Sequence, residues 1–174
     1  MKKPFIVMAM IFSTVFMLCS CGNHLSEEEQ KAIALTNDKV LFDTLIQSEK
    51  HMDSLFETIS NTDTINYDLY SQISTIKNLL TEQKRQVWRK IDAEDNEPLE
   101  NYTEAVLDYI RTADKACLFL MLYIESGDYS NLKSAEKFIG NLDNIVWDII
   151  AKRCVYLESE GFTEDEILEL LGQY

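Results

Sequence analysis

Residues 99–124 read LENYTEAVLDYIRTADKACLFLMLYI, and this stretch decides the fold. Its apolar residues recur at steps of three and four, the spacing that places them on one face of an α-helix. Neither glycine nor proline interrupts the stretch. It therefore predicts one long helix whose buried stripe consists of Leu99, Tyr102, Val106, Tyr109, Ala113, Cys117, Leu120 and Ile124.

An uncharged run from Ala116 to Ile124 lies within this helix. The run is too short to span a bilayer, which takes roughly 20 apolar residues. We expect it to be the most buried part of the protein. A contact patch for a partner is the alternative interpretation.

Signals for helix ends flank the stretch. Pro98 is tolerated in a first helical turn, so we expect the helix to begin at the segment Asp95–Pro98. Gly127 suits the helix end because glycine readily adopts the left-handed conformation in which many helices terminate. The expected helix therefore reaches about Ser126.

Three further stretches show the same spacing of apolar residues. They predict helices over residues 27–59, 66–93 and 131–158. In the helix over 27–59, Glu49 occupies a position of the apolar stripe where an apolar residue is expected. In the helix over 131–158, Gly140 indicates a bend or a close contact. The polar segment Asn61–Thr64 predicts the break between the first two helices, because such side chains bond their own backbone.

Two capping boxes mark additional helix starts. Ser26 is followed three residues later by Glu29, and Thr163 by Glu166, in the pattern where each side chain bonds the other residue's backbone N–H. The first box predicts the start of the helix over 27–59. The second predicts a short C-terminal helix that reaches about Leu171.

Together these elements indicate the fold class. Long helices joined by short loops fold back on one another. We expect an all-α domain over residues 27–174, an up-down four-helix bundle with a short fifth helix at the C-terminus. An extended pair of coiled-coil hairpins is the rival architecture, but the apolar stripes are broader than a two-position seam and favour the bundle.

Composition and charge exclude several classes of protein. Hydrophobic residues make up 46% of the chain, and Pro4 and Pro98 are its two prolines, so neither a disordered chain nor a turn-rich β fold is expected. The formal net charge at pH 7 is −14. Binding to nucleic acid requires lysine and arginine contacts with the phosphates, so we expect no nucleic-acid partner, whereas a basic protein would be steered toward such a surface.

Residues 1–20 differ in composition from the rest of the chain. Lys2 and Lys3 are followed by an uncharged, mostly apolar run from Pro4 to Leu18. This is the pattern of a secretory signal, and the run is shorter than a membrane-spanning helix requires. We expect residues 1–20 to be removed, which makes the mature chain still more acidic.

The segment ends in Leu18–Cys19–Ser20–Cys21. It resembles the lipobox of bacterial lipoprotein signals, in which an aliphatic residue and then a small residue precede the cysteine that receives lipid. Cys19 fits this pattern poorly, because bulky Leu18 directly precedes it. The resemblance covers residues 1–21 and implies cleavage before Cys21, lipid attachment to the Cys21 thiol, and stable membrane anchoring through two or more acyl chains such as palmitate. An ordinary secretory signal or an uncleaved anchor is the alternative.

Residues 21–26 then form a short tether ahead of Glu27–Glu29. Gly22 stands where the inner-membrane retention signal of enteric bacteria has aspartate. Acidic residues a few places after the lipidated cysteine resemble the surface-export signals of Bacteroidetes lipoproteins. These resemblances imply an outer-membrane location, on the periplasmic or the surface face. The alternative is that the acids simply suit the positive end of a helix.

Asp63–Thr64–Ile65 resembles the acceptor triplet of Bacteroidetes O-glycosylation. Such triplets arise easily by chance. The expected position in a loop makes Thr64 the candidate for modification.

No motif for catalysis, a cofactor or a metal is present in the sequence. A di-iron bundle needs Glu-x-x-His pairs, and neither His24 nor His51 has a glutamate three residues before it. Haem-attachment, zinc, phosphate-loop and nucleophile-elbow patterns are also absent. We therefore predict no enzymatic activity, no cofactor and no metal. The neighbouring His51 and Met52 could suggest haem ligation, but a surface histidine beside a core methionine explains them much better.

A basic cluster near the end of the helix over 66–93 is interpreted as structural. Cations complement the negative end of a helix dipole, and a ligand patch is the alternative. The cluster consists of Lys84, Arg85, Arg89 and Lys90.

The two cysteines of the expected bundle are Cys117 and Cys154. If the last two long helices are antiparallel, these residues lie roughly 20 Å apart along the bundle. A disulfide needs Cα atoms within about 7 Å. We expect two buried free thiols.

Three functions remain open. The first is a membrane-tethered helical lipoprotein that acts as a binding or structural module in the cell envelope, with an envelope protein as its partner. The second is an inhibitor or immunity protein that neutralises a basic toxin or hydrolase, which requires an acidic face left bare on the bundle. The third is an enzyme or cofactor carrier, which requires a deep pocket lined by converging polar groups.

Overall fold

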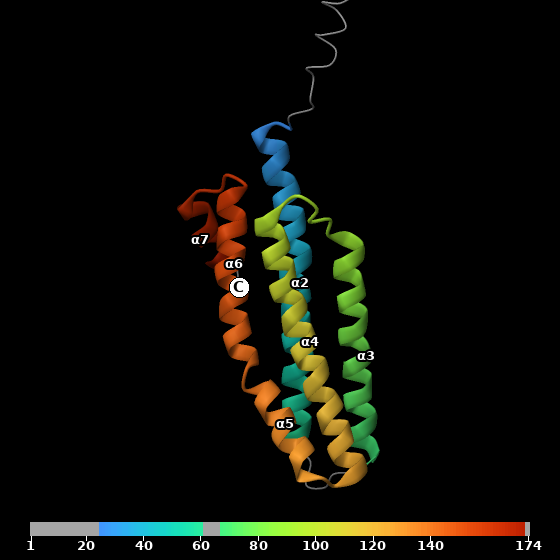
Figure 1. The fold of residues 1–174 in the computed structure, drawn as a ribbon. Helices are drawn as coiled ribbons and strands as arrows, with labels where there is room; N and C mark the ends of the chain where they lie inside the picture. The colour runs from blue at the N-terminus through green and yellow to red at the C-terminus, as the bar shows by residue number, and fades with distance from the viewer. Residues whose placement is uncertain (1–24, 61–66, 173–174) are drawn as a thin grey trace, which may run out of the picture.

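Each predicted apolar stripe forms a helix in the computed structural model, which describes residues 25–60 and 67–172. The result is an all-α, up-down four-helix bundle with a short C-terminal helix, as predicted (Figure 1). Its elements are α2 (Glu27–Ser60), α3 (Tyr67–Lys90), α4 (Glu97–Ser126), α5 (Tyr129–Ile139), α6 (Leu142–Ser159) and α7 (Glu164–Gly172). Among these helices none combines the length and apolarity needed to cross a membrane. The predicted break at Asn61–Thr64 falls outside the described residues.

The predicted bend in the last long helix is confirmed. The helix divides at Gly140 into α5 and α6, and together these two fill the fourth position of the bundle. Gly140 keeps a right-handed helical conformation (φ −64°, ψ −10°). A Cβ built there meets only the Glu136 carbonyl oxygen, at 3.3 Å. The glycine therefore marks a change of helix direction, and close packing against another helix is not its cause.

Helix ends follow the predicted signals. The Asn96 side chain accepts a hydrogen bond from the Leu99 N–H at 3.0 Å and caps α4. Gly127 ends α4 in the left-handed conformation, with φ of 69°. α3 ends at Lys90, three residues before the predicted position. Just beyond that end the Asp92 side chain accepts a hydrogen bond from the Glu94 N–H, a local bond that competes with continued helix.

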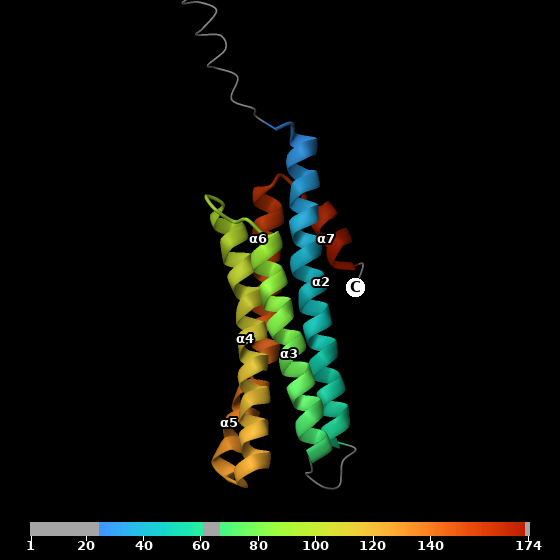
Figure 2. The same cartoon turned by 90° about the vertical axis from the view of Figure 1, so that its right-hand side faces the viewer.

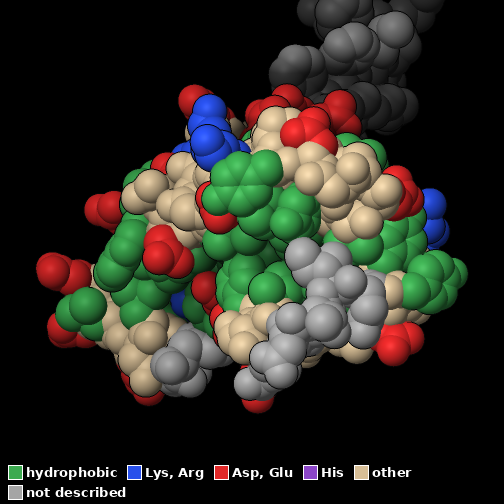
Figure 3. Space-filling view, turned by 90° about the horizontal axis from the view of Figure 1, so that it is seen from below, with side chains coloured by type: hydrophobic (Ala, Val, Ile, Leu, Met, Phe, Trp, Pro, Cys, Tyr) green, Lys and Arg blue, Asp and Glu red, His purple; other side chains and the backbone are tan. Residues whose placement is uncertain are grey.

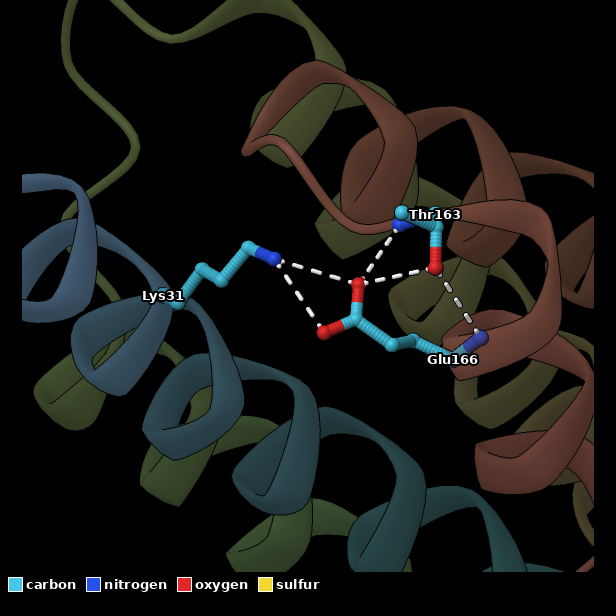
Figure 4. Close-up of polar contacts among 3 residues, drawn as sticks. All are labelled: Lys31, Thr163 and Glu166. Atoms are coloured by element: carbon cyan, nitrogen blue, oxygen red, sulfur yellow. Dashed lines mark hydrogen bonds and ion pairs between the residues drawn. The ribbon is translucent and has the colours of Figure 1, made fainter.

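Both capping boxes are confirmed, and the second also attaches α7 to α2 (Figure 4). Glu166 Oε2 accepts hydrogen bonds from the Thr163 N–H at 2.7 Å and from its hydroxyl at 3.0 Å. Lys31 of α2 donates to both oxygens of the same carboxylate, at 3.1 and 3.2 Å. The corresponding box at the start of α2 joins Ser26 to Glu29.

α4 is the central helix and packs against α2, α3, α5 and α6 (Figures 1 and 2). Burial along α4 is most continuous between Tyr102 and Ala113. The prediction that Ala116–Ile124 is the most buried part was wrong, because the side chains of Leu118 and Leu122 are 41% and 36% exposed. A run of nine apolar residues covers every side of a helix, and the bundle buries only some of those sides.

The seam between α2 and α6 is closed in its upper part by a buried ion pair. Arg153 of α6 donates to both carboxylate oxygens of Asp38 of α2, at 2.8 and 2.9 Å, and the two residues are only 1% and 4% exposed. The Tyr102 hydroxyl of α4 donates to Asp38 at 3.2 Å. The guanidinium also lies 3.9 Å from the ring centroid of Phe42. One buried cluster thus joins three helices.

α2 begins at the end of the bundle that carries the α3–α4 connection and the α6–α7 turn. Its first turns project beyond the other helices in both ribbon views (Figures 1 and 2). The described chain therefore starts at one extremity of the bundle. The α4–α5 turn lies at the opposite end.

The cysteines are both free, as predicted. Cys117 is buried, whereas Cys154 is only half-buried, so the expectation of two buried thiols holds for Cys117 alone. Burial, with a smaller contribution from the carboxylate of Asp114, raises the pKa of Cys117 to about 12.

We predict that replacing Asp38 with Ala lowers the free energy of unfolding by about 3–5 kcal/mol, because Arg153 is left buried without its carboxylate. A double variant, Asp38→Leu with Arg153→Met, should recover most of that loss. Urea unfolding at pH 7, followed by circular dichroism, measures both. As a control, Lys39→Ala removes an exposed ion pair with Asp43 and should cost less than about 1 kcal/mol. An Asp38→Ala variant as stable as the Lys39→Ala variant would contradict this account.

We also predict that Cys117 reacts with a water-soluble thiol reagent at least about tenfold more slowly than Cys154 in the folded protein, because the thiolate is the reactive form. After unfolding in urea without reductant, both residues should react fully. Mass spectrometry of the labelled peptides counts each one. Finding either cysteine unlabelled after unfolding would indicate a disulfide.

Candidate functional site

Below the buried ion pair, the seam between α2 and α6 opens into a groove of about 510 Å³. We call it the α2–α6 groove. Side chains of α2 form one wall, the α5–α6 bend forms the other, and Tyr109 of α4 lies between them. The lining residues are Ile46, Glu49, Lys50, Met52, Asp53, Phe56, Tyr109, Ile139, Gly140, Leu142, Asp143 and Val146.

Helical spacing explains how the walls form. Residues three and four apart share one face of a helix, so Glu49, Asp53 and Phe56 follow one another along the same side of α2. On the opposite wall, the bend at Gly140 starts a new helix, and Asp143 falls in the first turn of α6. The positive end of the helix dipole stabilises a carboxylate at that position.

The groove concentrates negative charge. Glu49 is half-buried, and burial raises the pKa of its carboxyl above the ordinary value, with the charges of Asp53 and Asp143 raising it further. The same three carboxylates raise the pKa of the Tyr109 hydroxyl, on top of the larger effect of burial. Lys50 also lines the groove, yet in the described part of the chain no ion pair joins it to these acids.

Tyr109 is the most unusual residue of the groove. Its residue as a whole is only 3% exposed, and within the described residues no side chain or backbone group bonds its hydroxyl. The hydroxyl is not among the fully buried polar atoms that lack a partner. Tyr109 lines the groove, so its ring is packed in the core while its hydroxyl is accessible to a group that enters the groove.

This combination determines what the groove can bind. Three carboxylates above apolar walls attract a cation that carries an apolar body. Within residues 25–60 and 67–172, no group of three or more histidine, cysteine, aspartate or glutamate side chains is arranged to hold a metal ion.

Two further pockets lack these features. One, of about 450 Å³, lies between α2 and α3, and its charges are mixed, with Lys39 and Asp43 paired at 2.8 Å. The other, of about 530 Å³, lies between α6 and α7, where Phe162, Ile167 and Leu168 give it a largely apolar lining. The α6–α7 pocket also carries two carboxylates, Glu158 and Glu164, and the α2–α6 groove differs from both pockets in combining three carboxylates with the hydroxyl of Tyr109.

The end-on view shows how charge and apolar surface are distributed near the α4–α5 turn (Figure 3). Hydrophobic side chains gather at the centre of this end, and aspartate and glutamate side chains lie around them. Lysine and arginine appear at few places in the view. This end of the bundle therefore presents an acidic rim around apolar surface.

The residues singled out from the sequence lie elsewhere. Cys21, the predicted lipid-attachment residue, and Thr64, the predicted glycosylation acceptor, are outside the described residues. His51 is half-buried on α2.

The basic cluster at the end of α3 has local contacts. Arg85 and Arg89 both contact the Glu82 carboxylate, at 3.5 and 3.7 Å. The Lys84 ammonium lies 4.7 Å from the ring centroid of Trp88. Arg89 and Lys90 also occupy the last turn of the helix, where they complement its dipole. These contacts agree with a structural role for the cluster.

The sequence alone did not predict that the groove residues lie close to one another. One signal was available, because Glu49 stands in the apolar stripe of the first long helix, where a charge is unexpected. Tyr109 was placed in the core stripe of α4, which is correct for its ring. The convergence of Asp143 on Glu49 depends on how α6 lies against α2, which spacing along one helix does not specify.

Comparisons of the chain with protein-family models, with curated proteins and with solved structures find no match. The groove and the N-terminal sequence are therefore the two features that bear on function.

We predict that Glu49→Gln stabilises the protein at pH 7 and that this gain disappears as the pH falls below the pKa of a free glutamate. Because folding raises the pKa of Glu49, the folded state is favoured at low pH, and that contribution is lost as the pH rises through the folded-state pKa. Urea unfolding at a series of pH values measures the difference. Glu57→Gln, an exposed residue of α2 outside the groove lining, serves as the control. Equal effects of the two substitutions at pH 7 would contradict the prediction.

Proposed function

We propose that this chain is a lipid-anchored binding module of the bacterial cell envelope, with its lipid on Cys21 and a protein partner bound at the α2–α6 groove. The observation that carries the proposal is the groove itself, an open acidic surface that the hydroxyl of the otherwise buried Tyr109 helps to line. The lipobox-like segment Leu18–Cys21 supports the anchor. No catalytic role, cofactor, metal or nucleic acid forms part of the proposal.

The position of the groove agrees with an anchored body. α2 begins at one extremity of the bundle, and Glu49 lies 22 residues after Glu27 on the same helix. At 1.5 Å per residue, the groove is about 33 Å from the start of α2. A chain tethered through Cys21 would thus hold the groove well away from the lipid surface, where a partner has access to it.

The proposed location is the outer membrane, on its periplasmic or its surface face. Gly22 in place of aspartate and the acids Glu27–Glu29 support this location through their resemblance to known sorting signals. An inner-membrane location is the alternative.

A second candidate is an inhibitor or immunity protein that neutralises a basic toxin or hydrolase. It requires an acidic surface that the bundle leaves bare, and the α2–α6 groove is such a surface. This candidate is a special case of the first, because both need a basic partner. They differ in whether binding abolishes an activity of that partner.

The anchor has a direct test. When cells are grown with labelled palmitate, we expect the protein and its Cys19→Ser variant to incorporate label, and the Cys21→Ser variant to incorporate essentially none. The Cys19→Ser variant is the matched control, because it changes a neighbouring thiol of the same segment. Mass spectrometry should find lipidated Cys21 at the N-terminus of the mature protein. Label in the Cys21→Ser variant, or an unmodified N-terminus, would disprove the anchor.

A further inference from the structure

We infer that the α2–α6 groove binds a lysine or arginine side chain of a basic partner protein, whose charge is held by Glu49, Asp53 and Asp143 and whose N–H bonds the Tyr109 hydroxyl oxygen. The inference rests on the proposed function and deepens it by naming the binding residues and the chemistry of the partner.

The Tyr109 hydroxyl supplies the first argument. Tyr109 lines the groove, its residue is only 3% exposed, and its hydroxyl bonds no group among the described residues. A phenolic oxygen held in this way is free to accept a hydrogen bond from a group that enters the groove. Carboxylates surround it, so an incoming group must be positively charged to approach. An ammonium or guanidinium N–H meets both requirements, because it donates to the phenolic oxygen and is attracted by the acids.

The groove walls supply the second argument. Met52 is buried, and Phe56 and Val146 are half-buried along the walls. Lysine and arginine place their methylene stems against apolar surface while the charged head stays among polar groups. The groove offers apolar walls for a stem and carboxylates for a head. A bare inorganic ion would leave the apolar walls unused.

An exposed tryptophan supplies the third argument. Trp147 follows Asp143 by four residues on α6, so the two share one side of the helix. The indole is 74% exposed. Tryptophan is enriched among the residues that contribute most to protein–protein binding, and its ring attracts lysine and arginine. A large exposed aromatic surface beside the acids favours a protein partner over a small free amine.

The net charge of the chain supports a positively charged partner. The chain has a formal net charge of −14, which would draw a basic protein toward it over long range. Lys50 is the single cation among the groove-lining residues. Since no ion pair to Glu49, Asp53 or Asp143 fixes it within the described residues, its side chain is able to turn outward when another cation enters.

The test uses the mature lipidated protein in phosphatidylcholine nanodiscs and a fluorescein-labelled alanine–lysine peptide with lysine at every fourth position. Fluorescence anisotropy measures the Kd in 0.15 M salt. The triple variant Glu49→Gln, Asp53→Asn, Asp143→Asn should raise the Kd about tenfold or more, because it removes the charges that hold the lysine. A control triple variant, Glu94→Gln, Glu100→Gln, Glu169→Gln, loses the same charge at exposed positions outside the groove. It should raise the Kd less than about threefold. Equal losses in the two triple variants would overturn the inference.

A second variant tests the hydroxyl separately. Tyr109→Phe should weaken peptide binding by about threefold to tenfold. It should leave the midpoint of urea unfolding unchanged or raise it, because the hydroxyl has no protein partner to lose in the free state. A lower midpoint with unchanged binding would overturn the assigned role of Tyr109. Asp143→Asn alone provides a milder version of the charge test if the triple variant folds poorly, with an expected increase in Kd of a few fold.

Two competing probes distinguish other occupants. Spermidine and CaCl₂, at concentrations equal in charge to the peptide, should displace less peptide than an unlabelled copy of it does. Displacement by either probe that is stronger than by the copy would overturn the protein partner in favour of a free amine or a metal ion. Palmitate labelling of the groove triple variant should equal that of the unchanged protein. If Cys21→Ser still carries label while the peptide results hold, the anchor is wrong and the groove assignment stands.

Discussion

The rotation of α2 and α6 against each other depends on one buried interaction, the ion pair between Arg153 of α6 and Asp38 of α2. Removing two charges from water is unfavourable, and the pair is stable because its geometry compensates. The guanidinium makes two short bonds to the carboxylate, Tyr102 donates a further bond, and the Phe42 ring lies beside the cation. Apolar contacts with α4 hold α2 and α6 in the bundle without specifying how either helix is rotated. The directional bonds of the ion pair specify that rotation, because only one pairing of the two faces satisfies both charges.

The groove is a consequence of this arrangement. α2 and α6 both pack against α4, and side chains rather than backbone contact close the seam between them: Arg153 meets Asp38, and Asn37 bonds Tyr156 at 3.3 Å. Further down the seam the walls carry the acids Glu49, Asp53 and Asp143, and the α5–α6 bend redirects the second wall. Like charges then face one another across the opening. Burial, together with this repulsion, raises the pKa of Glu49 above the ordinary value. The ionised carboxylate therefore lowers the stability of this part of the protein, and a bound cation would offset that loss. Such a local conflict is typical of binding sites and uncommon in purely structural surfaces.

Spacing along the chain predicted the helices, the bend at Gly140 and both capping boxes, because each depends on residues within one or two turns of each other. Burial along α4 was predicted less well. The apolar run Ala116–Ile124 covers the whole circumference of its helix, and the sequence does not say which side faces water. The ion pair can be recognised in the sequence after the fact, because each partner interrupts an apolar stripe. Asp38 lies between Ala34 and Leu41, and Arg153 lies between Ile149 and Leu157. Two opposite charges in two core stripes indicate a buried pair, yet pairing them requires the rotation of α6 against α2. The groove needs the same information, which explains why Glu49, Asp143 and Tyr109 were not connected from the sequence.

The proposed anchor and the proposed groove impose a common geometry through α2. This helix begins where the tether would end, and it later forms one wall of the groove. The separation of about 33 Å along α2 is about four times the Debye length of roughly 8 Å at physiological ionic strength. At that distance an anionic lipid surface neither repels the carboxylates of the groove nor competes effectively for a cation near it. An acidic binding site therefore functions on a lipid-anchored protein only if a rigid spacer separates the site from the headgroups. The first six or so turns of α2, fastened to α7 through Lys31 and to α6 through Asp38, have the length and the support to act as that spacer.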